Sequence, residues 1–311
     1  MSLRSVLRLG EVAIRVLDMK ASKQHYGDRM GLHEVMTDAQ GRVYYKAWDE
    51  HDHHCIVLRE ADAPGMDYLA FKVFDDHTLT GLEPKIRAFG LEVSHIEAGV
   101  YPKSGRRLQF TLPSGHVMQL YAHKEQTGNT LGTLNPGVLP DEGVIRGFRI
   151  NRLDHALLGG VNIDETARLF TEVFGFDLSE KLIDAESKQS LALFLSCSTK
   201  PHDVALVLQP TAGRFHHVSF LLESTHDVIH AADLIGKYRI PVDVGPNRHG
   251  ITRGATIYFF DPSGNRNEVF SGGYMHYPDT PTLIWDTSEL GHATFAQDNI
   301  VRESFLNVLT G

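Results

Sequence analysis

The sequence has little cysteine, no long apolar run and no block rich in basic residues. Its two cysteines, Cys55 and Cys197, have no metal-ligand spacing and are too few for a disulfide framework, which suits a reducing compartment. No run approaches the roughly 20 apolar residues that cross a bilayer, and the first residues lack a signal-peptide core. A net charge of −9 without clustered lysine and arginine argues against nucleic-acid binding. We therefore expect a cytoplasmic protein whose partner is a small molecule, neither nucleic acid nor membrane.

The chain contains two copies of one unit. Its 311 residues exceed the usual size of one hydrophobic core, so two domains are expected. A Pro-Ser-Gly triplet precedes the last of three matching positions in each half. Those positions are 57 and 51 residues apart in the first half and 62 and 51 apart in the second: Glu11, Tyr68 and Gln119, then His155, His217 and Glu268. Only the second copy has kept residues that bind metals.

Each half divides again into two quarters, and every quarter has the same pattern. A short strand is followed by a helix and then by several strands separated by turn residues, which predicts a βαβββ unit. In the third quarter Asp164 and Glu165 suit the first turn of a helix and Gly175 its end, and Asp18 and Gly31 play these parts in the first. We predict an α+β protein of paired βαβββ modules.

The stretch near the middle of the chain lacks a steady period and is rich in glycine and proline, so it is interpreted as a linker. The expected division is an N-terminal domain without a metal site, residues 1–130, a linker, residues 131–150, and a C-terminal catalytic domain with a terminal tail, residues 151–311.

The three candidate ligands, His155, His217 and Glu268, occur in segments that are typical of strands. Alternate residues of a strand face the same side, so His155 is expected to share its face with Leu153 and Leu157. The same rule places His217 beside Phe215 and Ser219, with His216 on the opposite side. Most of the 18 histidines are expected to be ordinary surface or core residues, and the repeat comparison is what distinguishes these two.

Two imidazoles and one carboxylate leave three coordination positions open. This arrangement is typical of non-haem Fe(II) that binds a substrate and O₂ together, whereas zinc usually keeps fewer open positions. Manganese accepts the same ligands, so Mn(II) is an alternative to Fe(II). A non-oxidative metal-dependent isomerase or transferase would usually add a second carboxylate, and a metal-free binding protein would have lost the ligands.

Several segments carry a resemblance to the catechol 2,3-dioxygenases, and the similarity extends over nearly the whole chain. They include Leu153-Asp154-His155-Ala156-Leu157, Phe215-His216-His217-Val218-Ser219-Phe220, Gly245-Pro246-Asn247-Arg248-His249-Gly250 and the run from Thr256 to Glu268. The resemblance implies the vicinal oxygen chelate fold of glyoxalases, bleomycin-resistance proteins and dioxygenases, in which the modules form incomplete barrels. It also implies a homotetramer and Fe(II)-dependent extradiol cleavage of catechol or substituted catechols by O₂, giving 2-hydroxymuconate semialdehyde in aromatic degradation.

The resemblance also assigns roles to individual residues. His155, His217 and Glu268 match the metal ligands, and His202 is the expected general acid/base because imidazole titrates near working pH. A histidine that merely caps a carbonyl is the alternative for His202. His249 and Tyr258 would hydrogen-bond substrate oxygens.

The first half holds Val100 and Gln109 at the positions of His249 and Tyr258, so its acid/base equipment is expected to be missing. The expected substrate-binding residues of the second half are Phe194, His249, Ile251, Tyr258, Thr294 and Phe305.

Two positions depart from the family pattern. Thr294 stands where relatives often have a bulkier aliphatic residue, and Arg253 stands where some have histidine. We hypothesise that Thr294 leaves room for a ring substituent such as a 3-methyl group.

Overall fold

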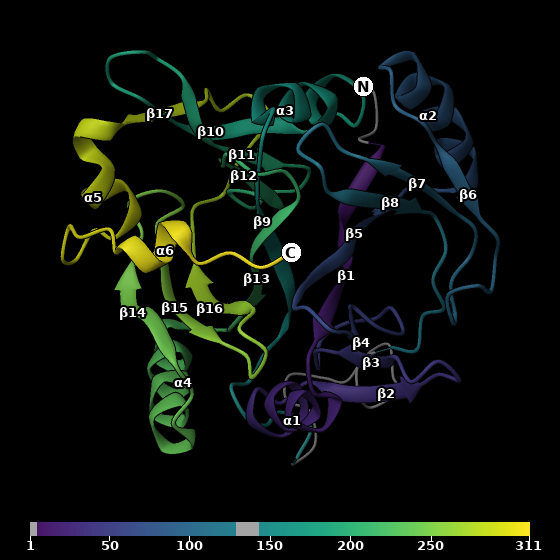
Figure 1. Ribbon diagram of the computed structural model, residues 1–311, viewed down its shortest axis with the longest axis horizontal. Helices are drawn as coiled ribbons and strands as arrows, with labels where there is room; N and C mark the ends of the chain where they lie inside the picture. The colour runs from purple at the N-terminus through teal and green to yellow at the C-terminus, as the bar shows by residue number, and fades with distance from the viewer. Residues whose placement is uncertain (1–4, 129–142) are drawn as a thin grey trace.

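The computed structural model describes residues 5–128 and 143–311, and the described chain forms the four predicted βαβββ modules (Figure 1). The first two modules supply β1 (Val6–Val16), α1 (Met19–Lys23) with its π-helical continuation η1 (Gln24–Arg29), β2 (His33–Thr37), β3 (Val43–Lys46), β4 (Ile56–Glu60), β5 (Gly65–Val73), α2 (Asp76–Ala88), β6 (Ser94–Ile96), β7 (Arg107–Thr111) and β8 (Val117–Tyr121).

The next two modules repeat this order and are followed by further short elements. They supply β9 (Arg152–Gly160), α3 (Ile163–Glu172), β10 (Asp177–Ile183), β11 (Ser190–Ser196), β12 (Val204–Leu208), β13 (Arg214–Leu221), α4 (Thr225–Tyr238), β14 (Val242–Arg248), β15 (Gly254–Phe260), β16 (Arg266–Gly272), β17 (Leu283–Asp286), η2 (Thr287–Glu289), α5 (Leu290–Thr294) and α6 (Glu303–Asn307).

The two halves build sheets with the same strand order. The first sheet runs β2-β3-β4-β1-β5-β8-β7-β6, and the second runs β10-β11-β12-β9-β13-β16-β15-β14 with β17 added beside β10. In each sheet the opening strands of the two modules pair antiparallel with each other, β1 with β5 and β9 with β13. The repeat counted along the sequence is therefore a repeat of topology, and the α+β vicinal oxygen chelate fold is confirmed.

The predicted helix signals are found at the helix ends. The Asp18 carboxylate accepts a hydrogen bond from the Ala21 amide at 2.9 Å, which satisfies a donor that the first turn leaves free. Gly175 lies just beyond α3 with φ +75, and Gly31 follows η1 with φ +92. A Cβ atom on Gly31 would overlap the Arg146 carbonyl, so both the backbone conformation and the close approach favour glycine there.

The two halves share one hydrophobic core. Strands β1 and β5 lie beside β9 and β13 at the middle of the molecule (Figure 1). The Phe71 ring on β5 packs edge-on against Phe170 and Phe176 of the second half, with centroids 6.0 and 5.4 Å away. Because this packing crosses the boundary, the first half supports the strands that carry the candidate ligands.

One sequence prediction concerns residues that the structure does not describe, and another differs from the structure. Of the predicted linker, residues 131–142 lie outside the described residues, as do residues 1–4, 129 and 130 of the predicted N-terminal domain. The sequence Gly245-Pro246-Asn247-Arg248-His249-Gly250 predicts a turn around His249, but its first four residues belong to β14, and the turn comes after them, at His249–Arg253. Across residues 5–128 and 143–311, no helix combines the length and apolar character needed to span a bilayer.

Candidate active site

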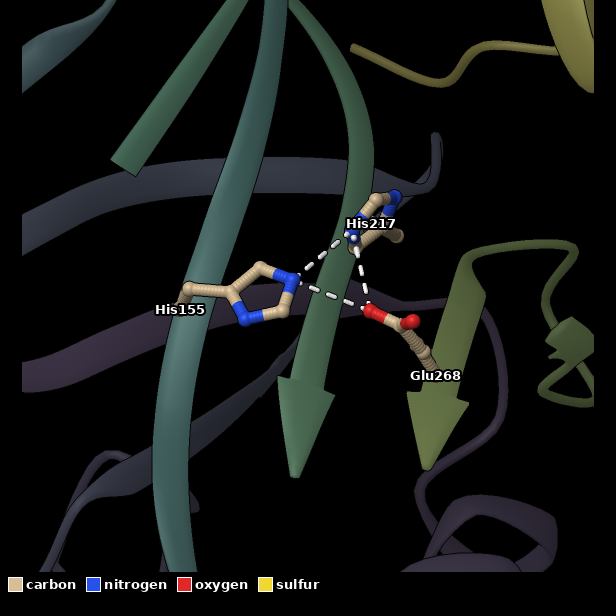
Figure 2. Close-up of side chains that lie close together, drawn as sticks. All are labelled: His155, His217 and Glu268. Atoms are coloured by element: carbon tan, nitrogen blue, oxygen red, sulfur yellow. Dashed lines mark hydrogen bonds and ion pairs between the residues drawn. The ribbon is translucent and has the colours of Figure 1, made fainter. Parts of the chain in front are cut away.

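Three neighbouring strands bring His155, His217 and Glu268 together (Figure 2). They come from β9, β13 and β16, and all three side chains are buried. The Nε2 atom of His155 lies 3.0 Å from the Glu268 Oε2 atom and 3.4 Å from the His217 Nε2 atom. The third separation, from His217 Nε2 to Glu268 Oε2, is 3.4 Å.

These separations fit a metal ion with three ligands on one face. Ligand atoms about 2.1 Å from a metal and at right angles to each other stand about 3 Å apart. The Glu268 Oε2 atom has no hydrogen-bond partner within residues 5–128 and 143–311 although it is buried, which is costly unless a cation neutralises it. Burial would raise the pKa of Glu268, but the adjacent imidazoles of His155, His217 and His249 hold it well below its usual range. The donor set therefore suits a divalent cation.

A β-bulge positions His155, and it corrects the predicted face. On β9, His155 pairs with Ser219 and Leu153 with Phe220, so Asp154 is the extra residue of the ladder. The bulge turns Asp154 toward His155, whose Nδ1–H donates to the Asp154 carboxylate at 2.8 Å. Leu157 lines the site cavity, whereas Leu153 packs into the main core, so the expectation that Leu153 shares the face of His155 is wrong.

A second bulge does the same on β13 and places His216 beside His217, not on the opposite side as predicted. Phe215 pairs with Leu158 and His217 with Leu157, which makes His216 the extra residue. Phe215 accordingly packs in the main core and does not share the face of His217. His216 also lines the cavity. An additional residue near the metal ligands was therefore missed, because strict alternation gives no sign of a bulge.

His216 determines which nitrogen of His217 faces the other ligands. Its Nε2–H donates to the Phe305 carbonyl at 2.8 Å, so its Nδ1 atom is an acceptor. Arg266 donates to the His216 Nδ1 atom at 3.2 Å. The His217 Nδ1 atom lies 2.8 Å from the same His216 Nδ1 atom. His217 must then carry its proton on Nδ1, and its Nε2 lone pair is left for a metal. Burial lowers the pKa of His217 to about 4, which keeps it neutral.

His202 precedes β12 and lies against His155, with ring centroids 4.1 Å apart. It lines the cavity, and its buried Nδ1 atom has no hydrogen-bond partner among the described residues. A structural histidine would be expected to use that atom to bond a carbonyl. Burial, followed by the positive charge of His155, holds the pKa of His202 well below its usual value. A neutral imidazole with free bonding capacity is thus available beside the ligands.

His249 and Tyr258 form a hydrogen-bonded pair on the other side of the cavity. The His249 Nδ1–H donates to the Thr294 carbonyl, so Nε2 is an acceptor for the Tyr258 hydroxyl at 2.9 Å. The Nε2 atom is also 3.7 Å from the Glu268 Oε1 atom. Burial and the Glu268 charge raise the pKa of Tyr258 well above its usual value, so its hydroxyl keeps the proton. Tyr258 is therefore a hydrogen-bond donor next to the ligands.

All residues expected to contact the substrate line one cavity of about 110 Å³. This volume is somewhat smaller than the roughly 150 Å³ of a cavity that binds benzene, and of the same order. Further apolar lining residues that the sequence did not reveal include Leu182, Ala192, Leu290 and Leu306. Arg253 does not line it; its guanidinium lies over the Tyr274 ring at 5.1 Å.

The matching residues of the first half, Glu11, Tyr68 and Gln119, also lie close together, but there the positive charge comes from side chains. The Glu11 carboxylate accepts hydrogen bonds from Tyr68 and from the Arg107 guanidinium at 2.9 Å and the Lys124 ammonium at 2.6 Å. Arg107 also donates to the Gln119 side chain at 2.9 Å. By ladder register Arg107 occupies the position of Thr256 in the second half. Two buried side-chain cations thus provide the positive charge that a metal would provide.

One expectation about the first half is wrong, because it does retain a histidine at the acid/base position. Ile56 pairs with Val12 as Val204 pairs with Ala156, which places His54 in register with His202. Its Nε2 atom lies 3.2 Å from the Glu11 carboxylate. Burial and then Lys124 lower the pKa of His54 to about 4. Four of the five extra residues of the second half lie between His155 and His202, and they hid this match from counting.

The vicinal oxygen chelate fold and the convergence of His155, His217 and Glu268 are typical of the metal-dependent enzymes with this fold. Comparison with known protein families agrees. The Glyoxalase/Bleomycin resistance protein/Dioxygenase superfamily model matches residues 152–269, and the Catechol 2,3-dioxygenase-like N-terminal domain model matches residues 66–125.

Individual relatives narrow the class. The metapyrocatechase of Pseudomonas sp. (strain CF600) is 49% identical over 308 residues, covering 99% of both chains. The structure of the 2,3-dioxygenase LapB from Pseudomonas sp. KL28 matches with a TM-score of 0.89 and 44% identity, over 92% of this chain and 99% of that chain. A manganese-dependent 2,3-dihydroxybiphenyl 1,2-dioxygenase of Geobacillus genomosp. 3 is 28% identical over 92% of this chain and 91% of its own. The chain belongs to the metapyrocatechase family, the catechol 2,3-dioxygenases, so extradiol cleavage of catechol is its function.

Proposed function

We propose that this protein uses Fe(II) to cleave catechol and alkyl-substituted catechols, giving 2-hydroxymuconate semialdehyde from catechol itself. The carbon–carbon bond between a hydroxylated carbon and its neighbour outside the diol breaks, and both atoms of one O₂ enter the product. The observation that carries this proposal is the convergence of His155, His217 and Glu268 ligand atoms, 3.0 to 3.4 Å apart, at the wall of the ring-sized cavity.

The proposed metal ligands are His155, His217 and Glu268, each through the atom that faces the other two. Fe(II) held there would keep a net positive charge, lower the pKa of a bound hydroxyl and bring the diol and O₂ together. The Asp154 and His216 contacts support this assignment, because metal-bound histidines usually donate their second N–H to a neighbouring acceptor. Mn(II) is the alternative ion, in keeping with the manganese-dependent relative.

His202 is proposed to be the general acid/base. Its lowered pKa leaves the imidazole neutral, and its Nδ1 atom is unpartnered, so it can accept the proton of the second hydroxyl and later return a proton to the reacting oxygen. Its position against His155 places it over the side of the cavity next to the ligands.

His249 and Tyr258 are proposed to bind a substrate oxygen. The Tyr258 hydroxyl points its proton toward His249 in the free site, and it would turn this donor to an oxygen that gains negative charge. Phe194, Ile251, Thr294 and Phe305 are proposed to hold the ring and to keep water away, since the lining is mainly apolar.

We further propose the domain division given above, with residues 1–130 as a metal-free domain and residues 151–311 as the catalytic domain. The two sheets of matching order support this division. A homotetramer in the cytoplasm is proposed from the family resemblance, and light scattering of the purified protein tests the assembly.

The test is an anaerobic preparation loaded with Fe(II), to which catechol and oxygenated buffer are added. Oxygen uptake, the yellow semialdehyde and bound iron are measured for the wild type, Glu268→Ala, His202→Phe and the exposed control Glu165→Ala. We expect one O₂ per catechol for the wild type and control, loss of iron and activity for Glu268→Ala, and iron without turnover for His202→Phe. Metal binding without oxygen uptake in the wild type would contradict the proposal and favour a non-oxidative enzyme of this fold.

A further inference from the structure

One lysine side chain lies between the segments that carry His155 and His202. Lys200 belongs to the loop that joins β11 and β12, just before His202. Its Nζ atom is 2.9 Å from the Asp203 Oδ1 atom and 3.4 Å from the Asp154 Oδ1 atom. It also donates to the main-chain carbonyl of Asp154 at 2.5 Å. The ammonium therefore connects the β9 bulge to the loop of the proposed acid/base.

The second oxygen of each carboxylate makes contacts that matter for the site. The Asp154 Oδ2 atom accepts the Nδ1–H of His155 at 2.8 Å. The Asp203 Oδ2 atom accepts the Cys197 amide and the Ser198 hydroxyl, both at 2.9 Å, which fixes the loop on either side of His202. Lys200 thus acts on both imidazoles indirectly. It pairs with Asp154, which accepts the His155 N–H, and with Asp203, which fixes the loop that carries His202.

Burial makes this arrangement depend on the charge of Lys200. Asp154 is 2% exposed and Asp203 is fully buried, and an unpaired carboxylate is costly in such surroundings. Within residues 5–128 and 143–311, no other lysine or arginine lies within ion-pair distance of either carboxylate. Without the ammonium, the two carboxylates would separate or take up water. A shift of Asp154 would move the His155 imidazole, and a shift of Asp203 would move His202.

The metal-free half lacks all three members of this network. The ladder register that aligns His54 with His202 places Asp52 at the position of Lys200 and Cys55 at that of Asp203. Gly10 stands at the position of Asp154, because Glu11 matches His155. The network is therefore present only where the ligands are, although both halves have the same fold.

We propose that Lys200 is a positioning residue that orients the His155 imidazole and fixes its distance from His202 by bridging Asp154 and Asp203. This inference rests on the proposed metal ligands. It goes beyond them by giving a residue outside the cavity a role in metal retention and in the proton step. Supporting contacts of this kind typically change metal affinity by roughly 10- to 100-fold.

The experiment measures the rate at which Fe(II) leaves the holoenzyme to a colorimetric chelator under nitrogen, together with kcat and KM for catechol. The variants are Lys200→Met, which keeps the length of the chain but removes the charge, and Lys200→Arg, which restores it. Lys188→Met is the control, because Lys188 is exposed and its ammonium donates to the nearby Ala185 carbonyl, outside the site cavity. Thermal unfolding of the metal-free forms verifies that each variant folds.

We expect iron release from Lys200→Met to be roughly 10- to 100-fold faster, with kcat reduced more than KM is changed, and partial recovery in Lys200→Arg. Iron release and kcat at wild-type values in Lys200→Met would overturn the inference. If Lys200→Met does not fold, Asp154→Asn takes its place. Iron release at the wild-type rate from Asp154→Asn would also overturn the inference. A wild type that binds Fe(II) but consumes no O₂ would instead contradict the proposed reaction, while the release comparison would still stand.

Discussion

Replacing Arg107 with methionine is expected to destabilise the protein by about 3–5 kcal/mol, because it leaves a buried carboxylate with half of its cationic partners. Glu11, Arg107 and Lys124 are all essentially inaccessible to solvent. Burial would raise the pKa of Glu11, but Arg107 and then Lys124 hold it well below its usual range. The variant also removes the donor to Gln119 and the cation that lies 4.3 Å from the centre of the Tyr101 ring.

The assay is urea unfolding of the metal-free protein at pH 7, since a bound metal would add its own stabilisation. Arg106→Met is the matched control: this neighbour pairs with Asp76 at 3.3 Å on the surface, and exposed pairs contribute about 1 kcal/mol or less. The double variant Glu11→Gln with Arg107→Met should be less destabilised than the sum of the two single variants, because the carboxylate and guanidinium interact directly.

A loss below about 1 kcal/mol for Arg107→Met, equal to that of the control, would refute the reasoning that these cations occupy the place of a metal. So would additive effects in the double variant. The same reasoning predicts that the wild type binds one metal ion per chain, since the first half already has its positive charges.

Three other predictions follow from single residues. His202→Phe should lower kcat by about 10²- to 10⁴-fold with the metal content unchanged, as measured by steady-state kinetics and metal analysis; loss of metal would contradict an acid/base role. Thr294→Ile should reduce kcat/KM for 3-methylcatechol relative to catechol by roughly tenfold, because its side chain lines the cavity, and an unchanged ratio would reject the hypothesis. Burial lowers the pKa of His25 to about 4, from an unfolded value of 6.5, so the unfolded chain binds the proton first and stability falls as the pH drops from about 6.5 to about 4. His25→Gln should remove roughly 2 kcal/mol of that fall in urea titrations at pH 7 and pH 4.5, and equal losses in both proteins would contradict it.

Counting along the sequence was enough for the architecture. Matching spacings around Tyr68 and His217 predicted a repeated unit, and the strand orders of the two sheets confirm it. The fold class was also predicted correctly, because alternation, helix caps and turn residues are local signals. The family and extradiol cleavage were predicted correctly from the resemblance of several segments to the catechol 2,3-dioxygenases. The proposed ligands could be selected by comparing the two halves, because only one half has a complete set of metal-binding side chains at the three matching positions.

The details that decide the chemistry depended on the tertiary structure. Bulges at Asp154 and His216 changed which side chains face the ligands, and the bulges arise from how strands pair, which no single strand reveals. The substitution of Arg107 and Lys124 for a metal was equally hidden, because Arg107 lies on β7 and Lys124 beyond the end of β8, and both meet Glu11 only in the folded sheet. Composition and periodicity thus determined the repeated fold and the candidate ligands of this protein. Burial and pairing between distant segments determined protonation states, the tautomer of each ligand and the shape of the cavity, since electrostatic interactions act through space and not along the chain.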